Sequence, residues 1–435
     1  MKKIIINALW VSILLFSVFS ISSCGDDDDA VVVPEVVVTP EPEPEPEPEP
    51  IPENEIRITA GESAADDAQL AFIEVQEDMI IVFGEGTFSF TNTLSMDGKT
   101  NVIVRGAGRD ETVLDFSGQT AGGDAVLVSN SNRIRFENMT VQDAQGDALK
   151  ARDCNTISFV NVATVWSGEP STDNGAYGLY PVLCTEVYID NCYAFGASDA
   201  GIYVGQSDQV IVTNSVAEGN VAGIEIENTT NADVFNNEAF DNTGGILVFD
   251  LPGLTQTGSN VRVFNNDCRD NERPNFAPEG NIVGSVPTGT GVMVLSTQNV
   301  EIFGNTLTNN NFANVIVASL LIFQDPPDDP NYNPFPSGIF IHDNTYTLEG
   351  TVQAAAQTPF VQQLIGLLAL TGNGQPNILL DGLLMEENAV CVQEAEGVSF
   401  VNINAGDPTF MSVTNDISTV DCVQEPLPEI SFDVF

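Results

Sequence analysis

The sequence predicts an all-β protein, a right-handed parallel β-helix in which each coil of the solenoid contains three short strands. The first observation behind this prediction is an internal repeat of about 22 residues that begins near residue 123. The segment from Asp199 to Asn214 aligns with the segment from Val221 to Asn236 without a gap. A unit of this length cannot bury its apolar face alone, so we expect the units to stack.

The second observation is that the aligned repeats form apolar columns. One column in the first strand contains Val126, Leu149, Leu179, Ile202, Ile224, Ile246 and Val292. More variable residues alternate with this column, and a period of two indicates a strand with one buried face. The same pattern recurs in a second strand at Val210 and Val212, and in a shorter third strand at Ala217. Stacking these coils ~4.8 Å apart would build one continuous core.

An asparagine follows the second strand in six successive repeats. The six positions are Asn138, Asn161, Asn191, Asn214, Asn236 and Asn265. Asparagine tolerates the backbone bend of a tight turn, and its amide can both donate and accept a hydrogen bond. We therefore expect an inward-facing ladder of amides with a structural role.

The segments on either side of the repeat predict two caps. Residues 62–76 place Ala64, Ala68, Ala71 and Val75 on one helical face, which suits a helix over the open edge of the first coil. We assign residues 61–350 to the β-helix and residues 351–435 to a C-terminal cap region. The cap is expected to hold a short helix at 360–370 and strands at 378–380, 389–392 and 398–403.

Residues 1–23 have the pattern of a cleaved signal peptide, with two lysines before an apolar stretch from Ile4 to Phe19. The following Ile21-Ser-Ser-Cys24 resembles the lipobox of bacterial lipoproteins, which implies that Cys24 is lipidated and anchors the protein to a membrane. Asp26 to Asp29 resembles an acidic export signal for surface lipoproteins. We therefore expect an outer membrane lipoprotein at the cell surface, with the periplasm as the alternative.

Residues 24–60 are predicted to be an acidic linker rich in proline and glutamate. Proline alternates with glutamate from Pro40 to Pro52, and fixed proline φ angles and like-charge repulsion keep such a segment extended. The linker would hold the folded domain away from the membrane.

The charge of the chain excludes nucleic acid as a partner. The 435 residues include 62 acidic and 13 basic side chains, for a formal net charge of −49. Residues 1–60 contain 12 of the acids and 3 of the bases, which leaves 50 and 10 for the remainder. A polyanion would be repelled by such a domain. The single histidine, His342, also excludes a site built from several histidines.

Residues 61–420 resemble the secreted, lipoprotein-type right-handed parallel β-helix repeat family, which is pectin-lyase-like and related to pectate lyases and alginate epimerases. The repeat carries this resemblance, together with Arg105-Gly-Ala-Gly108 and Thr112-Val-Leu-Asp115 in the first coils. Tyr177-Gly-Leu-Tyr-Pro181 resembles the start of the alginate-epimerase motif, but Tyr180, Pro181 and Val182 replace the acidic and histidine residues that follow in that motif. The resemblance implies a polysaccharide as partner.

Insertions predict where a binding site lies, because loops on a rigid scaffold commonly carry function. Residues 169–175 and 272–288 enlarge the turn before the first strand, residues 251–257 enlarge the turn after it, and residues 326–336 form a further excursion. The first three flank the outer face of one sheet, and we therefore expect a groove there. Lys150, Arg152, Tyr177, Tyr180 and Tyr203 fall on or beside that face.

These side chains could act on an acidic sugar. Lys150, Tyr180 or Tyr203 could remove the C5 proton of a uronate while Arg152 neutralises its carboxylate, as β-elimination or epimerisation requires. Tyr177 would contribute to substrate binding. The simpler interpretation is that Lys150 and Arg152 belong to a solvated charge cluster and that the tyrosines cover the strand surface.

Glu225, Glu227 and Asp250 are assigned to substrate binding on the same face. No cofactor or metal is required by the sequence, but these three carboxylates could bind Ca²⁺ and bridge an acidic sugar to an acidic protein. The alternative is that they are solvated, like most carboxylates in so acidic a domain.

Cysteine positions predict two disulfides in an oxidising compartment. Cys154 and Cys184 occupy the same column in successive repeats, which would place their Cα atoms about 4.8 Å apart. Cys391 and Cys422 form the second predicted pair.

Two functions from different classes remain open at this point. The first is a surface lipoprotein that binds an extracellular polysaccharide along the first sheet and cleaves or modifies it, as a polysaccharide lyase or related enzyme would. The second is a non-catalytic structural or protein-binding β-helix that resembles an adhesin.

Overall fold

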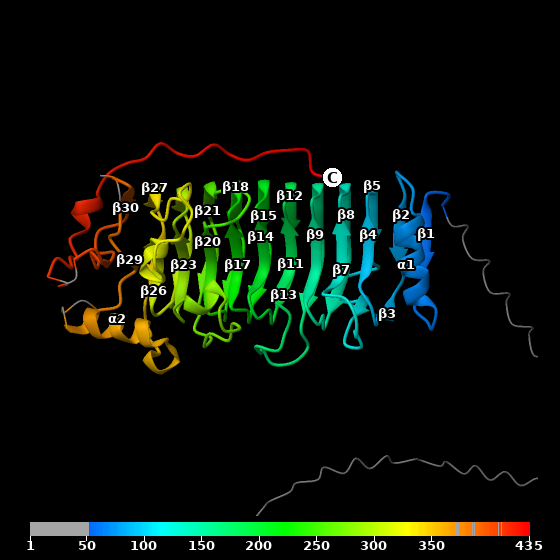
Figure 1. Cartoon of the computed structure of the whole chain (residues 1–435), viewed down its shortest axis with the longest axis horizontal. Coiled ribbons are helices and arrows are strands. Elements are labelled where there is room, and N and C mark those ends of the chain that lie inside the picture. The colour runs from blue at the N-terminus through cyan, green and yellow to red at the C-terminus, as the bar shows by residue number, and fades with distance from the viewer. Residues whose placement is uncertain are drawn as a thin grey trace, which may run out of the picture. The chain divides into compact units, whose positions relative to one another are not determined.

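Three faces of parallel strands wind around one apolar core in the computed structural model of this protein (Figure 1). The structure describes residues 52–435 except 371, 373, 385, 387, 408 and 410. The predicted signal peptide, the lipidation of Cys24 and the linker up to residue 51 therefore lie outside the described residues. No described helix is long and apolar enough to cross a membrane.

The first sheet is the face that carries the predicted site. Its 11 strands are all parallel and stack in the order β4 (Leu94–Asp97), β7 (Asp124–Ser129), β9 (Asp147–Arg152), β11 (Tyr177–Val182), β14 (Ala200–Gly205), β17 (Ala222–Glu227), β20 (Gly244–Phe249), β23 (Thr290–Leu295), β26 (Ala313–Ala318), β29 (Ile378–Leu380) and β31 (Phe400–Asn402).

The second sheet stacks in the same direction along the solenoid. It contains β1 (Glu55–Ile58), β2 (Ile80–Phe83), β5 (Thr100–Arg105), β8 (Asn132–Gln142), β10 (Asn155–Val165), β12 (Thr185–Asp190), β15 (Asp208–Thr213), β18 (Thr230–Phe235), β21 (Ser259–Phe264), β24 (Gln298–Phe303), β27 (Ser337–His342) and β30 (Val390–Gln393).

The third sheet completes each coil. It contains β3 (Gly86–Ser89), β6 (Thr112–Asp115), β13 (Tyr193–Phe195), β16 (Val216–Glu218), β19 (Glu238–Phe240), β22 (Asp267–Arg269), β25 (Thr306–Thr308) and β28 (Thr345–Thr347). β8 and β10 bend through both the second and the third sheet, so these two faces are continuous.

The predicted fold is confirmed, and the register explains why. Ile202 lies beside Ile224 and Ile224 beside Ile246, as the repeat alignment requires, and all three side chains are fully buried. Each buried aliphatic side chain contributes about 1.5–3 kcal/mol relative to exposure, and the contribution recurs in every coil. The stacked apolar columns are therefore the main source of stability.

Both predicted ends of the β-helix differ from the structure. β1 pairs with β2, so strand structure begins at Glu55 and not at residue 61. At the other end, β29 pairs with β26 and β30 with β27, which carries the coil beyond residue 350. Residues 351–377 are an insertion within a coil rather than the start of a separate cap, because apolar strands resume in register after it.

The two predicted helices are present. α1 (Ala64–Glu74) buries Ala64, Ala68 and Ala71, and its Gln69 exchanges two hydrogen bonds with the backbone of Ser95 in β4. α2 (Pro359–Leu370) lies beside the last strands of the first sheet in Figure 1 and packs Val361 against its outer face.

The predicted inward asparagine ladder is displaced by one residue. Asn138 and Asn236 have φ angles of 59° and 56°, as a bend residue should, but their side chains point outward. The left-handed bend turns the next side chain inward instead. The buried ladder is therefore Asn237, Asn266, Asn305 and Asn344, whose amides hydrogen-bond in series at 2.9–3.1 Å.

One of the two predicted disulfides forms. Cys391 and Cys422 are bonded, whereas Cys154 and Cys184 are buried free thiols, so the prediction for that pair is wrong. Aligned side chains on neighbouring parallel strands run side by side, which keeps their Cβ atoms about 4.8 Å apart. A disulfide needs a Cβ separation of about 3.5–4.5 Å.

We expect an alkylating reagent to label four cysteines of the denatured, unreduced protein within the described residues. These are Cys154, Cys184, Cys192 and Cys268. Cys391 and Cys422 should become reactive only after reduction, and peptide mapping by mass spectrometry would distinguish the two groups. Protection of Cys154 and Cys184 before reduction would contradict the free-thiol assignment.

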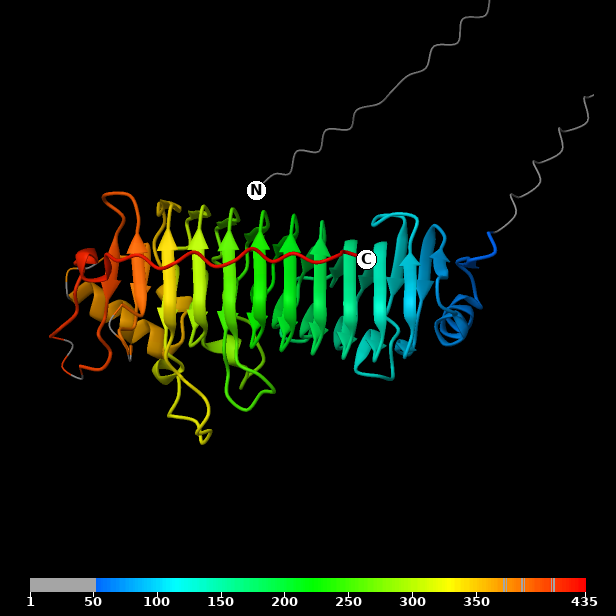
Figure 2. The same cartoon turned by 90° about the horizontal axis from the view of Figure 1, so that it is seen from above.

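Residues 423–435 form a C-terminal strap that runs back along the second sheet, shown in red in Figures 1 and 2. The backbone N–H of Leu427 donates to Glu301 at 2.9 Å, and that of Ile430 donates to Asp233 at 3.1 Å. The guanidinium of Arg133 lies 4.6 Å from the centre of the Phe435 ring. The strap therefore contacts strands β24, β18 and β8, which belong to well-separated coils.

Candidate functional site

The outer face of the first sheet is accessible at its N-terminal end and covered toward its C-terminal end. Lys150 and Tyr180 are half-buried on neighbouring strands β9 and β11. Further along the same column, Tyr203 is 4% exposed, Glu225 is 1% exposed and Leu247 is fully buried. Only the part of this face formed by β4 to β11 can therefore meet a large ligand directly.

The insertions cover the remainder of the face. Val283 and Val286, from the loop before β23, pack with Leu247 and Met293 of the sheet, and α2 extends this apolar layer. The predicted open groove is thus wrong for β14 to β26. The physical reason is that the insertions carry apolar side chains, which fold down onto the sheet instead of standing as walls.

The covering loops are held by polar contacts. The Thr172 hydroxyl donates to the backbone carbonyl of Phe276 at 2.9 Å, which joins the loops before β11 and β23. The Asn281 amide donates to Asp199 at 2.8 Å. On the other edge of the sheet, the Tyr332 hydroxyl donates to the backbone carbonyl of Asp250 at 2.6 Å.

Three predicted site residues form an aromatic cluster. The ring centres of Tyr177, Tyr180 and Tyr203 lie 4.4–4.9 Å apart. The Lys150 ammonium lies 4.4 Å from the centre of the Tyr180 ring, within reach of a cation–π interaction. The Tyr180 hydroxyl has no hydrogen-bond partner among the described residues, while Tyr203 donates to Glu227 at 2.7 Å. We call Tyr177, Tyr180 and Tyr203 the tyrosine cluster.

The two predicted cations are each paired with a carboxylate already. Lys150 lies 3.2 Å from Asp147 and 3.6 Å from Asp124. Arg152 lies 3.1 Å from Asp153 and its side chain is 58% exposed. Neither cation is therefore available to bind a uronate without first breaking its ion pair, contrary to the predicted joint action of Lys150 and Arg152.

The tyrosines are poor candidates for a catalytic base. Burial raises the pKa of Tyr177, Tyr180 and Tyr203, and nearby carboxylates raise it further, chiefly Asp199, Asp147 and Glu227 respectively. A general base must be deprotonated near the working pH. These phenols remain protonated there, and those of Tyr177 and Tyr203 donate hydrogen bonds to Asp199 and Glu227.

Carboxyl groups with raised pKa values surround the tyrosine cluster. Both oxygens of Glu225 are buried without a hydrogen-bond partner among the described residues. Burial raises the pKa of Glu225 well above its usual value and raises that of Asp199 to about 7. Glu227 has a raised pKa for the same reason, although the Tyr203 hydroxyl lowers it in part. Burial also raises the pKa of Asp147, to about 6.

Asp124, Asp147, Asp199 and Asn281 are site residues that our sequence reasoning missed. Asp124 and Asp147 lie side by side at the starts of β7 and β9. An aspartate recurring at the same repeat position was therefore visible in the sequence. Asn281 carried no such signal, because it reaches Asp199 from a loop 82 residues away.

Asp250 has a structural contact that the sequence did not indicate. Its carboxylate accepts a hydrogen bond from the backbone N–H of Gly258 at 2.7 Å, which closes the loop after β20. Burial raises its pKa to about 7. No three His, Cys, Asp or Glu side chains within the described ranges are placed to hold a metal ion. Glu225, Glu227 and Asp250 are thus not arranged as ready calcium ligands.

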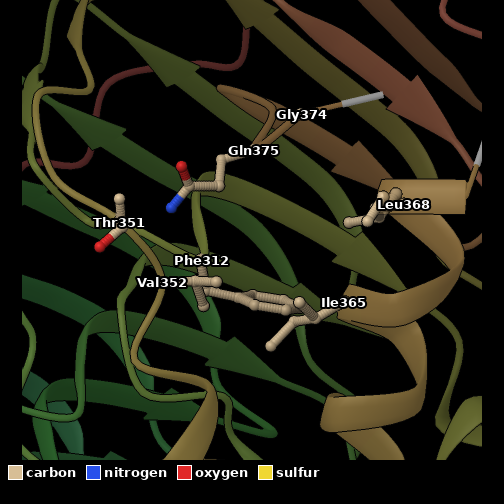
Figure 3. Close-up of a pocket in the computed structure, with 8 residues that line it drawn as sticks. Phe312, Thr351, Val352, Ile365, Leu368, Gly374 and Gln375 are labelled. Carbon is tan, nitrogen blue, oxygen red and sulfur yellow. The ribbon is translucent and has the colours of Figure 1, made fainter. Parts of the chain in front are cut away.

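Two pockets lie beside the covering loops rather than at the tyrosine cluster. One, of about 510 Å³, is lined by Asn275, residues 277–282, Gly284 and Ser285 together with Phe323, Gln324 and Gln357. The other, of about 200 Å³, is apolar and is formed between α2 and the coil by Phe312, Val352, Ile365 and Leu368 (Figure 3). Neither pocket is lined by a residue that the sequence assigned to the site.

Comparisons with known proteins agree with this architecture. The family model described as right handed beta helix region matches residues 124–348. An exopolygalacturonase from Thermotoga maritima superposes with a TM-score of 0.50, with 10% identity over 81% of this chain and 91% of that enzyme. The A-module of the mannuronan C-5 epimerase AlgE4 from Azotobacter vinelandii has a TM-score of 0.47, with 15% identity over 76% and 88% of the two chains. No curated protein sequence matches this chain. At 10% identity, the likeness to the exopolygalacturonase shows a shared fold alone.

Proposed function

Because the chain belongs to the right-handed β-helix family, we propose that it is a surface lipoprotein that binds an extracellular polysaccharide on the outer face of the first sheet. The binding surface would be the accessible part of that face, from β4 to β11, together with the edge of the tyrosine cluster. An elongated stack of parallel strands suits an elongated polymer, because each coil presents the same positions at a regular spacing.

The single observation that carries this proposal is the position of Tyr180. The residue is half-buried and its ring is packed between Lys150 and the other two tyrosines, so it is held rigidly. Its hydroxyl has no hydrogen-bond partner among the described residues. Tyrosine at a binding surface combines an apolar ring with a polar tip and loses little conformational freedom when a ligand binds. Sugars offer both apolar ring faces and hydroxyls to such a group.

The proposal is for binding without cleavage. β-Elimination needs a base near the tyrosine cluster, but Lys150 is paired with two aspartates and the phenols have raised pKa values. The only histidine, His342, lies on β27 of the second sheet. We therefore expect no ultraviolet-absorbing unsaturated product when polysaccharides are incubated with the protein.

Membrane anchoring and surface exposure belong to the same proposal and rest on the sequence around Cys24. Replacing Cys24 by alanine should move the protein from the membrane fraction to the soluble fraction. Protease treatment of intact cells would separate the surface from the periplasm, because only a surface protein would be digested.

We expect Tyr180→Ala to weaken polysaccharide binding by about tenfold, since aromatic contacts contribute about 0.5–1.5 kcal/mol beyond the area that they bury. Tyr188→Ala is the matched control, because Tyr188 is also a half-buried tyrosine but lies on β12 of the second sheet. Affinity electrophoresis in gels that contain the polysaccharide would measure both variants. Equal losses in the two variants would contradict the assigned face. Unchanged capture of a protein partner by Tyr180→Ala would favour the adhesin-like alternative.

A further inference from the structure

We propose that the tyrosine-cluster face selects an uncharged polysaccharide and excludes polymers of uronic acid. This inference rests on the proposed function and names the ligand class of the same site. It differs from the expectation that Lys150 and Arg152 would receive an acidic sugar.

Carboxyl groups outnumber cations around the tyrosine cluster. Tyr177 interacts electrostatically with Asp199, Glu225 and Glu227, and Tyr180 also with Asp124 and Asp147. Within the part of the chain that the structure describes, Lys150 is the one cation in contact with the cluster. A uronate would bring a further carboxylate into a region where Asp124 and Asp147 already share one ammonium group. Like charges at a partly dehydrated surface repel strongly, because the surrounding medium screens them less than water does.

Both described cations near the cluster, Lys150 and Arg152, are already paired. The Lys150 ammonium is shared between Asp147 and Asp124 and also lies over the Tyr180 ring. Arg152 is paired with Asp153 and extends into solvent. Carboxylate recognition in proteins usually depends on an arginine that can offer two parallel N–H groups. Here a uronate would have to displace an existing ion pair.

The same side chains suit the hydroxyls of a neutral sugar. A carboxylate accepts hydrogen bonds only, and each sugar hydroxyl can donate one. Asp124 and Asp147 stand side by side at the edge of the accessible strands, and the Tyr180 hydroxyl lies on the next strand. These groups supply acceptors and a donor next to an aromatic surface. A sugar that is bound through its hydroxyls brings no charge to the site, so the negative charge of the domain does not oppose its binding.

The experiment compares polymers that differ in charge but share a backbone. The purified full chain would be tested against polygalacturonate and its fully methyl-esterified form, against alginate and its propylene glycol ester, and against neutral laminarin and galactomannan. Binding would be measured at low salt with EDTA, in 0.5 M NaCl, and with added Ca²⁺. We expect neutral or esterified polymers to bind at least about tenfold more tightly than the free acids at low salt, and the difference to shrink in salt.

A variant in which the charge of the protein is changed, and not that of the polymer, tests the selection against uronates independently. Replacing Asp124 and Asp147 together by asparagine removes both carboxylates that pair with Lys150, which frees its ammonium group. This double variant should gain affinity for uronate polymers, and the ratio of uronate binding to neutral binding is the quantity to compare with the natural protein, because Asp124 and Asp147 also serve as acceptors for neutral sugars. A thermal melt shows whether the variant is folded. Lys150→Ala in the same background should abolish the gain.

The outcomes distinguish failure of the proposed polysaccharide binding from failure of the proposed selection for uncharged polymers. Binding of neutral but not acidic polymers supports the inference. Equal or tighter binding of uronate polymers in EDTA overturns it while leaving the proposed function intact, and uronate binding only with Ca²⁺ overturns it in favour of a calcium bridge. Binding to none of the polymers defeats the proposed function and the inference with it.

Discussion

Deletion of the C-terminal strap, residues 423–435, is expected to divide the thermal unfolding of the β-helix into two transitions. A solenoid is stabilised mainly by contacts between neighbouring coils, so its ends can unfold separately. The strap adds contacts between distant coils, because it begins beside the Cys391–Cys422 disulfide and reaches Glu301 on β24, Asp233 on β18 and Arg133 on β8. Without it, the coils that contain β24 to β30 should unfold at the lower temperature.

The energetic basis of this prediction is the loss of two hydrogen bonds to buried acids. Glu301 is 4% exposed and Asp233 is 2% exposed, and each would lose a backbone N–H donor. A hydrogen bond to a charged group contributes about 1.5–3 kcal/mol. Calorimetry would count the transitions, and hydrogen exchange would assign them to coils. A single transition at an unchanged temperature would contradict the linking role of the strap.

Two single substitutions on the strap give a finer test. Ile430→Ala removes a side chain that is 9% exposed and should lower the free energy of unfolding by about 2 kcal/mol. Val434→Ala is the matched control, because Val434 is 44% exposed and its truncation should change stability by less than about 0.5 kcal/mol. Both variants keep the strap at full length, so any difference between them reports packing.

Replacing Glu225 by glutamine is expected to reduce the pH dependence of stability and to stabilise the protein at pH 8. Glu225 and Asp199 have raised pKa values in the folded protein, because burial penalises their charged forms. The folded state therefore binds more protons than the unfolded state above about pH 4, where free carboxyls ionise. Stability is fully present below that pH and is lost as the pH rises toward 7 and beyond, at up to about 1.4 kcal/mol per pH unit for each such group.

The substitution separates Glu225 from the other buried acids. Glutamine cannot ionise, so the stability of Glu225→Gln should fall less between pH 5 and pH 8 than that of the natural protein. Glu225→Leu should be more stable than the natural protein at both pH values, because the register neighbour of Glu225 on β20 is Leu247. Urea titrations at the two pH values would measure both variants, with the exposed Glu77→Gln as control. An unchanged pH profile in Glu225→Gln would show that Glu225 does not contribute to it.

Much of the fold could be predicted because every repeat places apolar residues at the same positions, where each coil must bury them. The columns of Ile202 and Val210 are buried in every coil, and an error at one repeat would have been corrected by the next. The boundaries were less predictable. β1 begins at Glu55 although no repeat precedes it, and the insertion of residues 351–377 interrupted the period before the final strands.

The candidate site was predicted in part. The sequence located Lys150, Tyr180 and Tyr203 on one face, and the tyrosine cluster brings two of them together with Tyr177. The sequence did not indicate that Tyr203 and Glu225 would be covered, since outward positions on a strand normally meet solvent. Their burial depends on loops that come from remote parts of the chain.

The sequence by itself determined the parallel β-helix, the face that carries its insertions and the acidity of the domain, because these follow from periodicity and composition. Only the tertiary structure decided which outward side chains meet solvent, which carboxyls pair with Lys150 and which cysteines bond. The physical reason is that stacking is dictated by local columns that repeat in register, whereas covering loops, ion pairs and the strap join residues whose separation in the chain follows no period. Asn281 with Asp199 and Ile430 with Asp233 are two such pairs.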